Sequence, residues 1–184
     1  MSLDSTDSAA HVPDVVAPSL RILFCGINPG RRSGAVGHHF AHPGNRFWKA
    51  LALAGLTDRQ YSPGEEQLLL GHGLGITNLV ERTTATASEL SRDELKRGAA
   101  SLGHKVRALG PSAVAFLGLG AYRIAFGRPR APLGRQPELL GGAIVWVVAN
   151  PSGLQARYGV EEIAGQLREI VADCARRGSI GSSS

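Results

Sequence analysis

The sequence predicts a single α/β domain of three layers, in which helices cover both faces of a central, mostly parallel sheet. Four short apolar runs indicate strands buried on both faces, because their apolar residues do not alternate with polar ones. Segments with helical apolar spacing separate these runs, and strands that alternate with helices are typical of a parallel sheet. The length of 184 residues suits one domain with a sizeable core.

The first half of the domain is predicted from one apolar run and two helix signals. Residues 21–26 form a short apolar run and indicate a buried strand. A loop rich in Gly and His at 31–45 leads into a helix at about 45–55, where the apolar spacing becomes helical. The Ser-x-x-Glu pattern of residues 62–65, with Pro at the first helical position, predicts a further helix at about 63–71.

The second half continues the alternation. A strand is expected at 74–80, followed by a loop rich in Thr and Ala at 82–90. A second Ser-x-x-Glu pattern begins at Ser91, and Gly110 precedes a proline, so these two residues bound the next helix. The remaining elements are strands at 113–118 and 143–149 and helices at 119–126 and about 160–176.

The two ends of the chain differ in composition from the domain between them. Residues 1–19 are rich in Ser, Asp, Ala and Pro without apolar periodicity, which predicts a disordered leader. Residues 178–184 are expected to be a flexible tail, so the domain spans 20–177. The leader lacks the pattern of a signal peptide, and no apolar stretch is long enough to span a bilayer. Two cysteines, Cys25 and Cys174, do not suggest a disulfide framework, and we expect a cytoplasmic protein.

The charge of the chain favours an anionic partner. The formal net charge is +5, and all but three of the 20 basic residues are Arg, a residue suited to bidentate phosphate contacts. A general bias toward Arg in the genome would give the same composition. One basic segment either follows a phosphate backbone or is a solvated loop; it contains Arg123, Arg128, Arg130 and Arg135.

The most informative motifs follow two of the predicted strands. Residues 26–30 read Gly-Ile-Asn-Pro-Gly, and residues 150–154 read Asn-Pro-Ser-Gly-Leu. Asn, Pro and Gly are ordinary turn residues, so each motif alone is compatible with a plain turn. However, open α/β sheets bind ligands at the carboxyl ends of their strands. The two loops are therefore expected to form two walls of one cleft.

The string GINPGRRSGAVGHHFAHPGNRFW, together with NPSGL, closely resembles the mismatch-specific uracil-DNA glycosylases, which are bacterial relatives of thymine-DNA glycosylase. The middle block GITNLVER at 75–82 is also similar to this family, and the resemblance covers roughly residues 20–175. It implies a repair enzyme that removes uracil from G·U mismatches by base flipping, acting as a monomer on double-stranded DNA. A monofunctional enzyme is expected, because none of Lys49, Lys96 and Lys105 lies in either motif loop, where an amine could form a Schiff base. No cofactor is expected.

The resemblance implies the roles of residues in the first loop. Asn28 would position the water that attacks the sugar, without the negative charge that an Asp gives other superfamily members. The backbone N–H of Ile27 would donate to the pyrimidine, on which the ring of Phe40 would stack. Gly30 replaces a Tyr that excludes the 5-methyl group in uracil-selective relatives. The pocket is therefore expected to admit bulkier pyrimidines such as thymine or etheno-cytosine, as weaker substrates than uracil. Asn150, in the second loop, is also expected to contact the substrate.

The resemblance also assigns a DNA-binding role to the second loop. Leu154 would fill the space that the flipped nucleotide vacates. The family places an Arg shortly after this residue to contact the opposite base, but here one extra residue precedes Arg157. Either Gln155 or Arg157 therefore takes that role. Ser152 and Gly153 complete the predicted DNA contacts.

Several alternatives remain beside this interpretation. Asp93 or Glu94 would be the alternative source of the charge that Asn28 lacks, although helix capping explains both. A metal site is not expected, because the Gly-rich loop that carries His38, His39 and His42 contains no Cys or carboxylate, and two cysteines cannot hold a four-cysteine iron–sulfur cluster. A hydrolase that binds phosphate with residues 26–30 is a further alternative, but this segment lacks the Lys of a phosphate-binding P-loop. The main alternative function is a non-catalytic sensor of flipped or mismatched bases.

Overall fold

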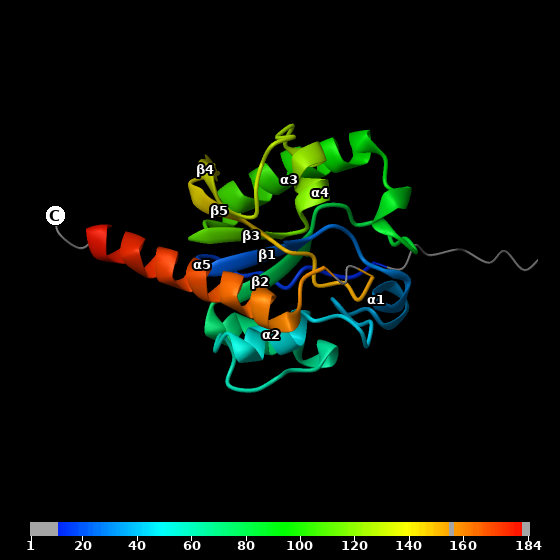
Figure 1. The fold of residues 1–184 in the computed structure, drawn as a ribbon, viewed down its shortest axis with the longest axis horizontal. Helices are drawn as coiled ribbons and strands as arrows, with labels where there is room; N and C mark the ends of the chain where they lie inside the picture. Colours follow the sequence, from blue (N-terminus) through cyan, green and yellow to red (C-terminus); the bar gives the residue numbers. More distant parts are fainter. Residues whose placement is uncertain (1–10, 155–156, 182–184) are drawn as a thin grey trace, which may run out of the picture.

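The computed structural model describes residues 11–154 and 157–181 and confirms the predicted α/β architecture. Its five-stranded sheet has the order β2-β1-β3-β5-β4 (Figure 1). Four strands pair in parallel; they are β1 (Ile22–Gly26), β2 (Leu74–Asn78), β3 (Ala113–Leu117) and β5 (Ala143–Val148). The edge strand β4 (Gly134–Leu140) is antiparallel to β5. The carboxyl ends of the four parallel strands therefore meet at one edge of the sheet.

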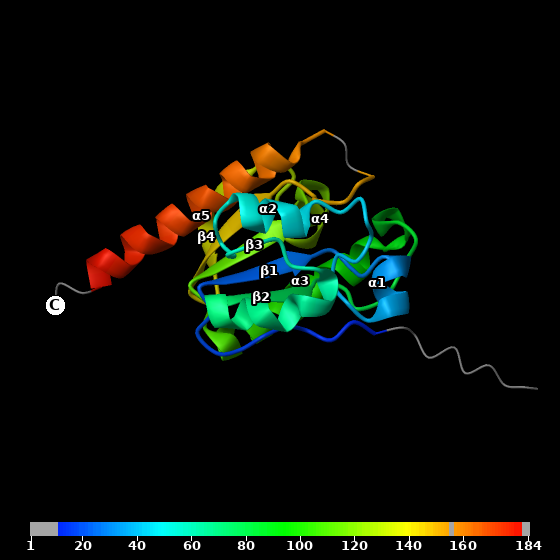
Figure 2. The same ribbon diagram turned by 90° about the horizontal axis from the view of Figure 1, so that it is seen from below.

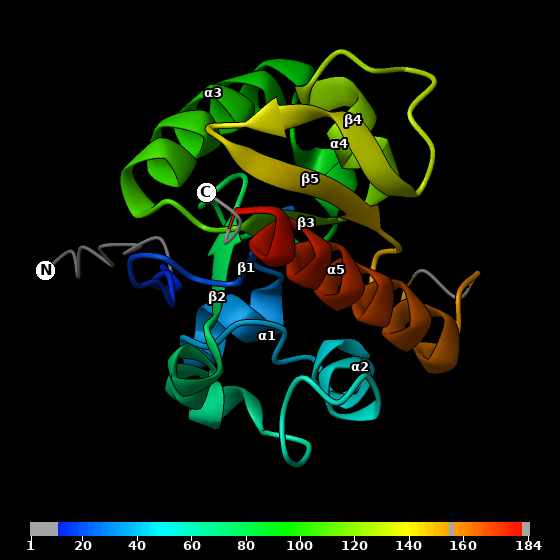
Figure 3. The ribbon, with the colours of Figure 1, turned by 90° about the vertical axis from the view of Figure 1, so that its left-hand side faces the viewer.

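Helices cover both faces of the sheet, as Figures 1 and 3 show. One apolar cluster lies between the sheet and α2 (Phe47–Leu53), the 3₁₀ helix η1 (Pro63–His72) and α5 (Val160–Gly181). A second cluster lies under α3 (Arg92–Leu109) and α4 (Leu119–Ala125). Every residue of β1, β3 and β5 is buried, which explains why these strands lack the alternation of a half-exposed sheet. Among the described helices, none is both long and apolar enough to cross a membrane.

Three regular elements were not expected from the sequence, and the shortest is the 3₁₀ helix η2 (Ala87–Glu89) in the predicted loop at 82–90. The helix α1 (Arg31–Val36) lies within the predicted loop at 31–45, where Arg, Ser and Gly give no apolar period. The strand β4 was missed because it contains a proline, has a register irregularity between Arg135 and Leu139, and buries few of its residues. In addition, η1 is a 3₁₀ helix, although its Ser62–Glu65 capping box is present as predicted.

Part of the predicted leader is ordered, which corrects the expectation for residues 11–19. Val12 and Val15 are buried, and Val15 forms an antiparallel bridge with Ile76 of β2. Asp14 accepts a charge-assisted hydrogen bond from Lys105 on α3. Two valines and one ion pair are too few to produce a periodic pattern, yet they hold the segment on the domain. At the other end, α5 continues to Gly181, beyond the predicted start of the tail at 178.

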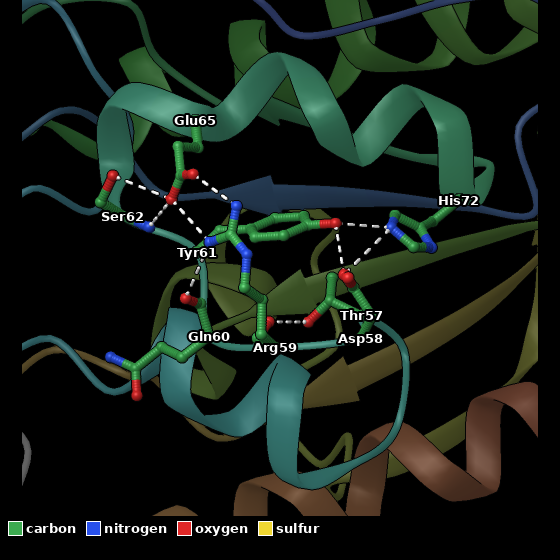
Figure 4. A network of polar contacts seen from close by, with 8 residues as sticks. All are labelled: Thr57, Asp58, Arg59, Gln60, Tyr61, Ser62, Glu65 and His72. Atoms are coloured by element: carbon green, nitrogen blue, oxygen red, sulfur yellow. Dashed lines mark hydrogen bonds and ion pairs between the residues drawn. The ribbon is translucent and has the colours of Figure 1, made fainter.

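A polar network holds the connection between α2 and η1 (Figure 4). Tyr61 donates to Asp58 at 2.7 Å, and its hydroxyl also lies 2.8 Å from Nε2 of His72. Arg59 lies over the Tyr61 ring and forms two hydrogen bonds with Glu65. The Arg59 guanidinium is the main reason that the pKa of Glu65 falls to about 2. The network explains how a loop rich in polar residues holds a fixed conformation outside the cleft.

Candidate active site

A cavity of about 310 Å³ opens at the carboxyl edge of the sheet. Its lining includes residues 26–32, which follow β1, and residues 150–154, which follow β5. Leu117 at the end of β3 lies between these two segments in the sheet order. The two Asn-Pro loops thus form two walls of one cleft, as expected from their positions at strand ends. This is where the strand order reverses around β1 and β3, the usual ligand site of such a sheet.

Asn28 is held with its amide oxygen free to accept a hydrogen bond. Its Nδ2 donates to the carbonyl oxygen of Arg82 and to Oγ1 of Thr84, each at 2.8 Å. Thr84 donates its own hydroxyl hydrogen to Thr86 O, so Oγ1 can only accept from Asn28. Within the described part of the chain, no protein donor satisfies Oδ1 of Asn28. This oxygen can therefore hold a water molecule in a fixed direction.

The described residues that line the cavity include no carboxylate. Glu94 forms an ion pair with Arg82 at 2.9 Å and accepts from the backbone N–H of Ser91. The Arg82 guanidinium is the main cause of lowering the pKa of Glu94 to about 2. Asp93 is exposed in the first turn of α3. The structure thus gives both residues the helix-end positions that their sequence pattern indicated and places neither at the cavity.

Phe40 lines the cavity while it is anchored on the core. Its ring centroid lies 4.2 Å from that of Phe47, a buried residue of α2. A Cβ placed on Gly26 would lie 3.3 Å from the Phe40 ring, so the glycine lets the ring approach β1 closely. Phe40 has a φ of 50°, which is unusual for an aromatic residue and typical of strained positions at binding sites. The ring is thus held by the core at the cavity, where it can stack on a planar ligand.

Asn78 also lines the cavity, together with Asn28, Asn45 and Asn150, and was not predicted as a site residue. It ends β2 and pairs in register with Gly26, so it lies beside the end of β1. His39 Nε2 donates to the carbonyl oxygen of Pro13 at 2.9 Å, which leaves Nδ1 to accept from Asn78 Nδ2 at 3.4 Å. The histidine therefore fixes the orientation of the Asn78 amide. Its position at the end of a predicted strand, within the family-like block at 75–82, was the signal that could have revealed this residue.

Gly30 leaves open space in the cavity wall. A Cβ placed on Gly30 would meet no atom within 4 Å, and its backbone is extended, with φ −75°. Neither backbone strain nor packing therefore requires glycine here, and a larger side chain would occupy part of the cavity. The next residues, Arg31 and Arg32, are exposed at the cavity, and neither forms an ion pair with a described carboxylate.

The second wall presents an exposed leucine. Asn150 Oδ1 accepts from the backbone N–H of Ser152 at 2.9 Å, and Ser152 Oγ accepts from Leu154 N at 3.3 Å. These bonds shape a turn at the end of β5. The Leu154 side chain at this turn is 75% exposed, the highest value among the large exposed hydrophobic residues.

Gln155, Arg157 and a basic segment complete the predicted contacts with DNA. Gln155 falls outside the described residues. Arg157 is exposed, and its guanidinium lies 5.5 Å from the centre of the neighbouring Tyr158 ring. In the basic segment, Arg123 donates to Ala131 O. Arg128 and Arg135 form ion pairs with Glu138 and Asp173, respectively. Three of the four arginines in that segment thus have partners within the protein.

The histidines of the first loop have structural partners. His38 Nδ1 lies 2.9 Å from Glu66 Oε1, and the other oxygen of Glu66 accepts from the backbone N–H of His39. His42 is exposed and accepts from Gly44 N. The described residues contain no cluster of three or more potential metal ligands.

The environment of His39 predicts a dependence of stability on pH. Burial lowers the pKa of His39, against smaller opposing effects of the Pro13 carbonyl, Glu66 and Asp14. Below about pH 6.5 the unfolded chain binds a proton at this residue that the folded protein resists, so the free energy of unfolding should fall as the solution becomes more acidic. Denaturant titrations at pH 7.5 and 5.5 would measure this loss. His39→Gln should reduce it, whereas substitution of the exposed His104 by Gln should not; equal losses in all three proteins would contradict the prediction.

Comparisons with known proteins identify the family of the chain and a similar fold. A family model described as the uracil DNA glycosylase superfamily matches residues 13–172. The fold is similar to the solution NMR structure of a candidate uracil DNA glycosylase from Methanosarcina acetivorans, with a TM-score of 0.59 and 16% sequence identity. That match covers 89% of this chain and 98% of the other. The chain therefore belongs to the uracil DNA glycosylase superfamily.

Proposed function

We propose that the protein is a mismatch-specific DNA glycosylase that hydrolyses the N-glycosidic bond of uracil in G·U pairs. The observation that carries this proposal is the orientation of Asn28, whose two amide hydrogens are used by Arg82 O and Thr84 Oγ1. No described protein donor satisfies its Oδ1, and Asn28 lines a cavity without a carboxylate in the described lining. Such a site positions a water molecule rather than deprotonating it.

The cavity supports a mechanism based on positioning. The flipped pyrimidine would stack on Phe40, and the amide of Asn78 would bind its polar edge. As the C1′–N1 bond breaks, its electron pair leaves with the base, and the sugar becomes positively charged. The water held by Asn28 then adds to C1′ and loses its proton to solvent. Because an amide offers the cationic sugar no full charge, the rate should be lower than that of a relative with an Asp.

The surroundings of the cavity support a DNA partner. Leu154, an exposed apolar residue, would enter the stack when a nucleotide leaves it, and Gln155 or Arg157 would contact the opposite base. Arg31 and Arg32 are exposed at the same opening and could bind phosphates. We propose that a single copy of the chain is sufficient for this arrangement, because both walls come from one domain.

Gly30 supports a broad substrate range. The open space beside it would accept a 5-methyl group or an etheno ring, so thymine and etheno-cytosine are proposed as slower substrates. The cost of opening a correct base pair would then be the main barrier to attack on normal DNA.

The enzyme is proposed to be monofunctional, because strand cleavage requires an amine that forms a Schiff base. None of the lysines lines the cavity: Lys49 and Lys96 are exposed on helices, and Lys105 is paired with Asp14. Incubation with a duplex containing one G·U pair should give an abasic site, which alkali then cleaves. Strand cleavage without alkali, or a protein–DNA adduct trapped with borohydride, would contradict the proposal.

A non-catalytic sensor of flipped bases is the alternative function. It would use Phe40 and Leu154 but would have no need for the fixed amide of Asn28. Binding of G·U duplex without any abasic product over long incubation would favour the sensor.

A further inference from the structure

We infer that Arg46 is a positioning residue that clamps the base of the loop carrying Leu154, an inference that rests on the proposed function. Arg46 lies at the N-terminal end of α2, far in sequence from this loop. Figures 1 and 2 show the start of α2 beside the chain that leaves β5.

The guanidinium of Arg46 bonds to both ends of the loop. Its Nη2 donates to Ser152 O at 2.9 Å, and its Nε lies 3.4 Å from Pro151 O. Its Nη1 donates to Tyr158 O, on the other side of Leu154. The backbone N–H of Arg46 also donates to Pro151 O, at 2.9 Å. One half-buried side chain therefore joins the entrance and the exit of the loop.

The chemistry of arginine suits this role. A planar guanidinium presents several N–H groups in a fixed fork, so it can bind carbonyl oxygens from separate segments at once. Hydrogen bonds from a charged donor are also stronger than neutral ones. A lysine at this position would keep the charge but would have a single flexible nitrogen. Bridging, rather than charge, is therefore the property that arginine supplies here.

A second contact holds the same loop against the segment that leads from Phe40 to α2. A Cβ placed on Gly153 would lie 2.9 Å from Gly44 O and 3.2 Å from its carbonyl carbon. These are backbone atoms, which cannot move aside as the end of a side chain can. Gly44 lies between Phe40 and Arg46, so the loop is packed directly on the segment that leads from the cavity to α2.

The clamp should lower the entropic cost of inserting Leu154 into DNA. A side chain at the tip of an unrestrained loop would lose more freedom on insertion than one whose loop is already ordered. Leu154 is exposed and has little packing of its own to hold it. Arg46 should therefore act on excision through Leu154 and only where the DNA stack must be opened.

A double-mutant cycle tests this coupling. Arg46→Ala should slow single-turnover excision from a G·U duplex by about tenfold, the effect of losing one or two net hydrogen bonds. In a Leu154→Ala background, Arg46→Ala should lower the excision rate by less than about twofold. In the wild-type background, Arg46→Ala should lower the rate on uracil in an unpaired bubble by as little. Equal factors in both backgrounds, or on both DNAs, would overturn the inference.

Two further variants separate bridging from charge and from stability. Arg46→Lys should slow excision from duplex DNA as much as Arg46→Ala does. It also tests the loss of bridging if the alanine variant does not fold. Full activity of Arg46→Lys would mean that charge alone matters and would refute the clamp. Arg168 is the matched control, because it donates from α5 to Leu53 O at the other end of α2, away from the loop. Arg168→Ala should alter stability without a selective loss on duplex.

A measurement independent of activity distinguishes failure of this inference from failure of the proposed function. Trypsin can cut after the exposed Arg157, next to the residue whose carbonyl Arg46 binds. Arg46→Ala and Arg46→Lys should raise the rate of this cut by about tenfold under native conditions, and Arg168→Ala should not. Wild-type protein without glycosylase activity would reject the proposed function alone. Unchanged cleavage after Arg157 in both Arg46 variants would reject the clamp.

Discussion

Asn28→Ala is expected to slow single-turnover excision of uracil from a G·U duplex by about 10²–10⁴-fold, the range for a group that positions or activates a reactant. The expected loss is large because no carboxylate is available among the described residues of the cavity lining to take over the water. DNA affinity should change little, since Asn28 lies at the base pocket rather than at the exposed Leu154 turn. Rapid quenching of the reaction with excess enzyme would measure the chemical step.

Thr84→Val is the matched control for this variant. Valine has nearly the shape of threonine but cannot accept from Asn28 Nδ2, so the amide would keep its hydrogen bond to Arg82 O and a longer one to Pro29 O, at 3.3 Å. We expect a loss of about tenfold, smaller than that of Asn28→Ala, because the oxygen remains but is less firmly directed. An unchanged rate in Asn28→Ala would exclude Asn28 as the principal catalytic residue. It would point to a carboxylate such as Glu94, which would have to leave Arg82 and enter the cavity.

The strands and both cleft loops could be predicted because their signals are local. An apolar run followed by Asn-Pro indicates a buried strand and its end, and parallel strands place such ends at one edge of the sheet. Asn28 and Asn150 were identified in this way, and both line the cavity. The helix α1 was missed because its polar and Gly-rich sequence has no apolar period. The edge strand β4 was missed because it contains a proline and buries few of its residues.

The parts of the site that depend on long-range hydrogen bonds were not predictable. Thr84 lies in a loop of ordinary Thr and Ala residues, and its role depends on contact with Asn28, 56 positions away. Asn78 was seen only as part of a family-like block, and its orientation depends on His39 and the Pro13 carbonyl. Arg46 binds carbonyl oxygens, which carry no sequence signal at all. Residue types indicate what chemistry is available, whereas these partners depend on the folded chain.

Leu154→Ala is expected to slow excision from a G·U duplex by about tenfold to a hundredfold and to weaken duplex binding. Extruding a base costs a few kcal/mol, and a wedge that fills the gap offsets part of this cost. Each tenfold corresponds to about 1.4 kcal/mol, so this range is what one buried leucine side chain can supply. The side chain is exposed in the free protein and has little packing to lose, so the free energy of unfolding should barely change.

The substrate decides whether Leu154 enters the helix. Single-stranded uracil DNA, and uracil in an unpaired bubble, need little or no opening of a stack, so Leu154→Ala should affect them much less than the duplex. The wild-type enzyme should also process G·U faster than A·U, because the weaker pair costs less to open. Leu154→Ala should keep this order while slowing both reactions, since the wedge acts after either pair has separated.

Val36 offers a matched control, because it is also an exposed apolar residue but does not line the cavity. Val36→Ala should leave all these rates unchanged. Equal losses of Leu154→Ala on duplex, bubble and single strand would mean that Leu154 supports the loop and does not enter the DNA.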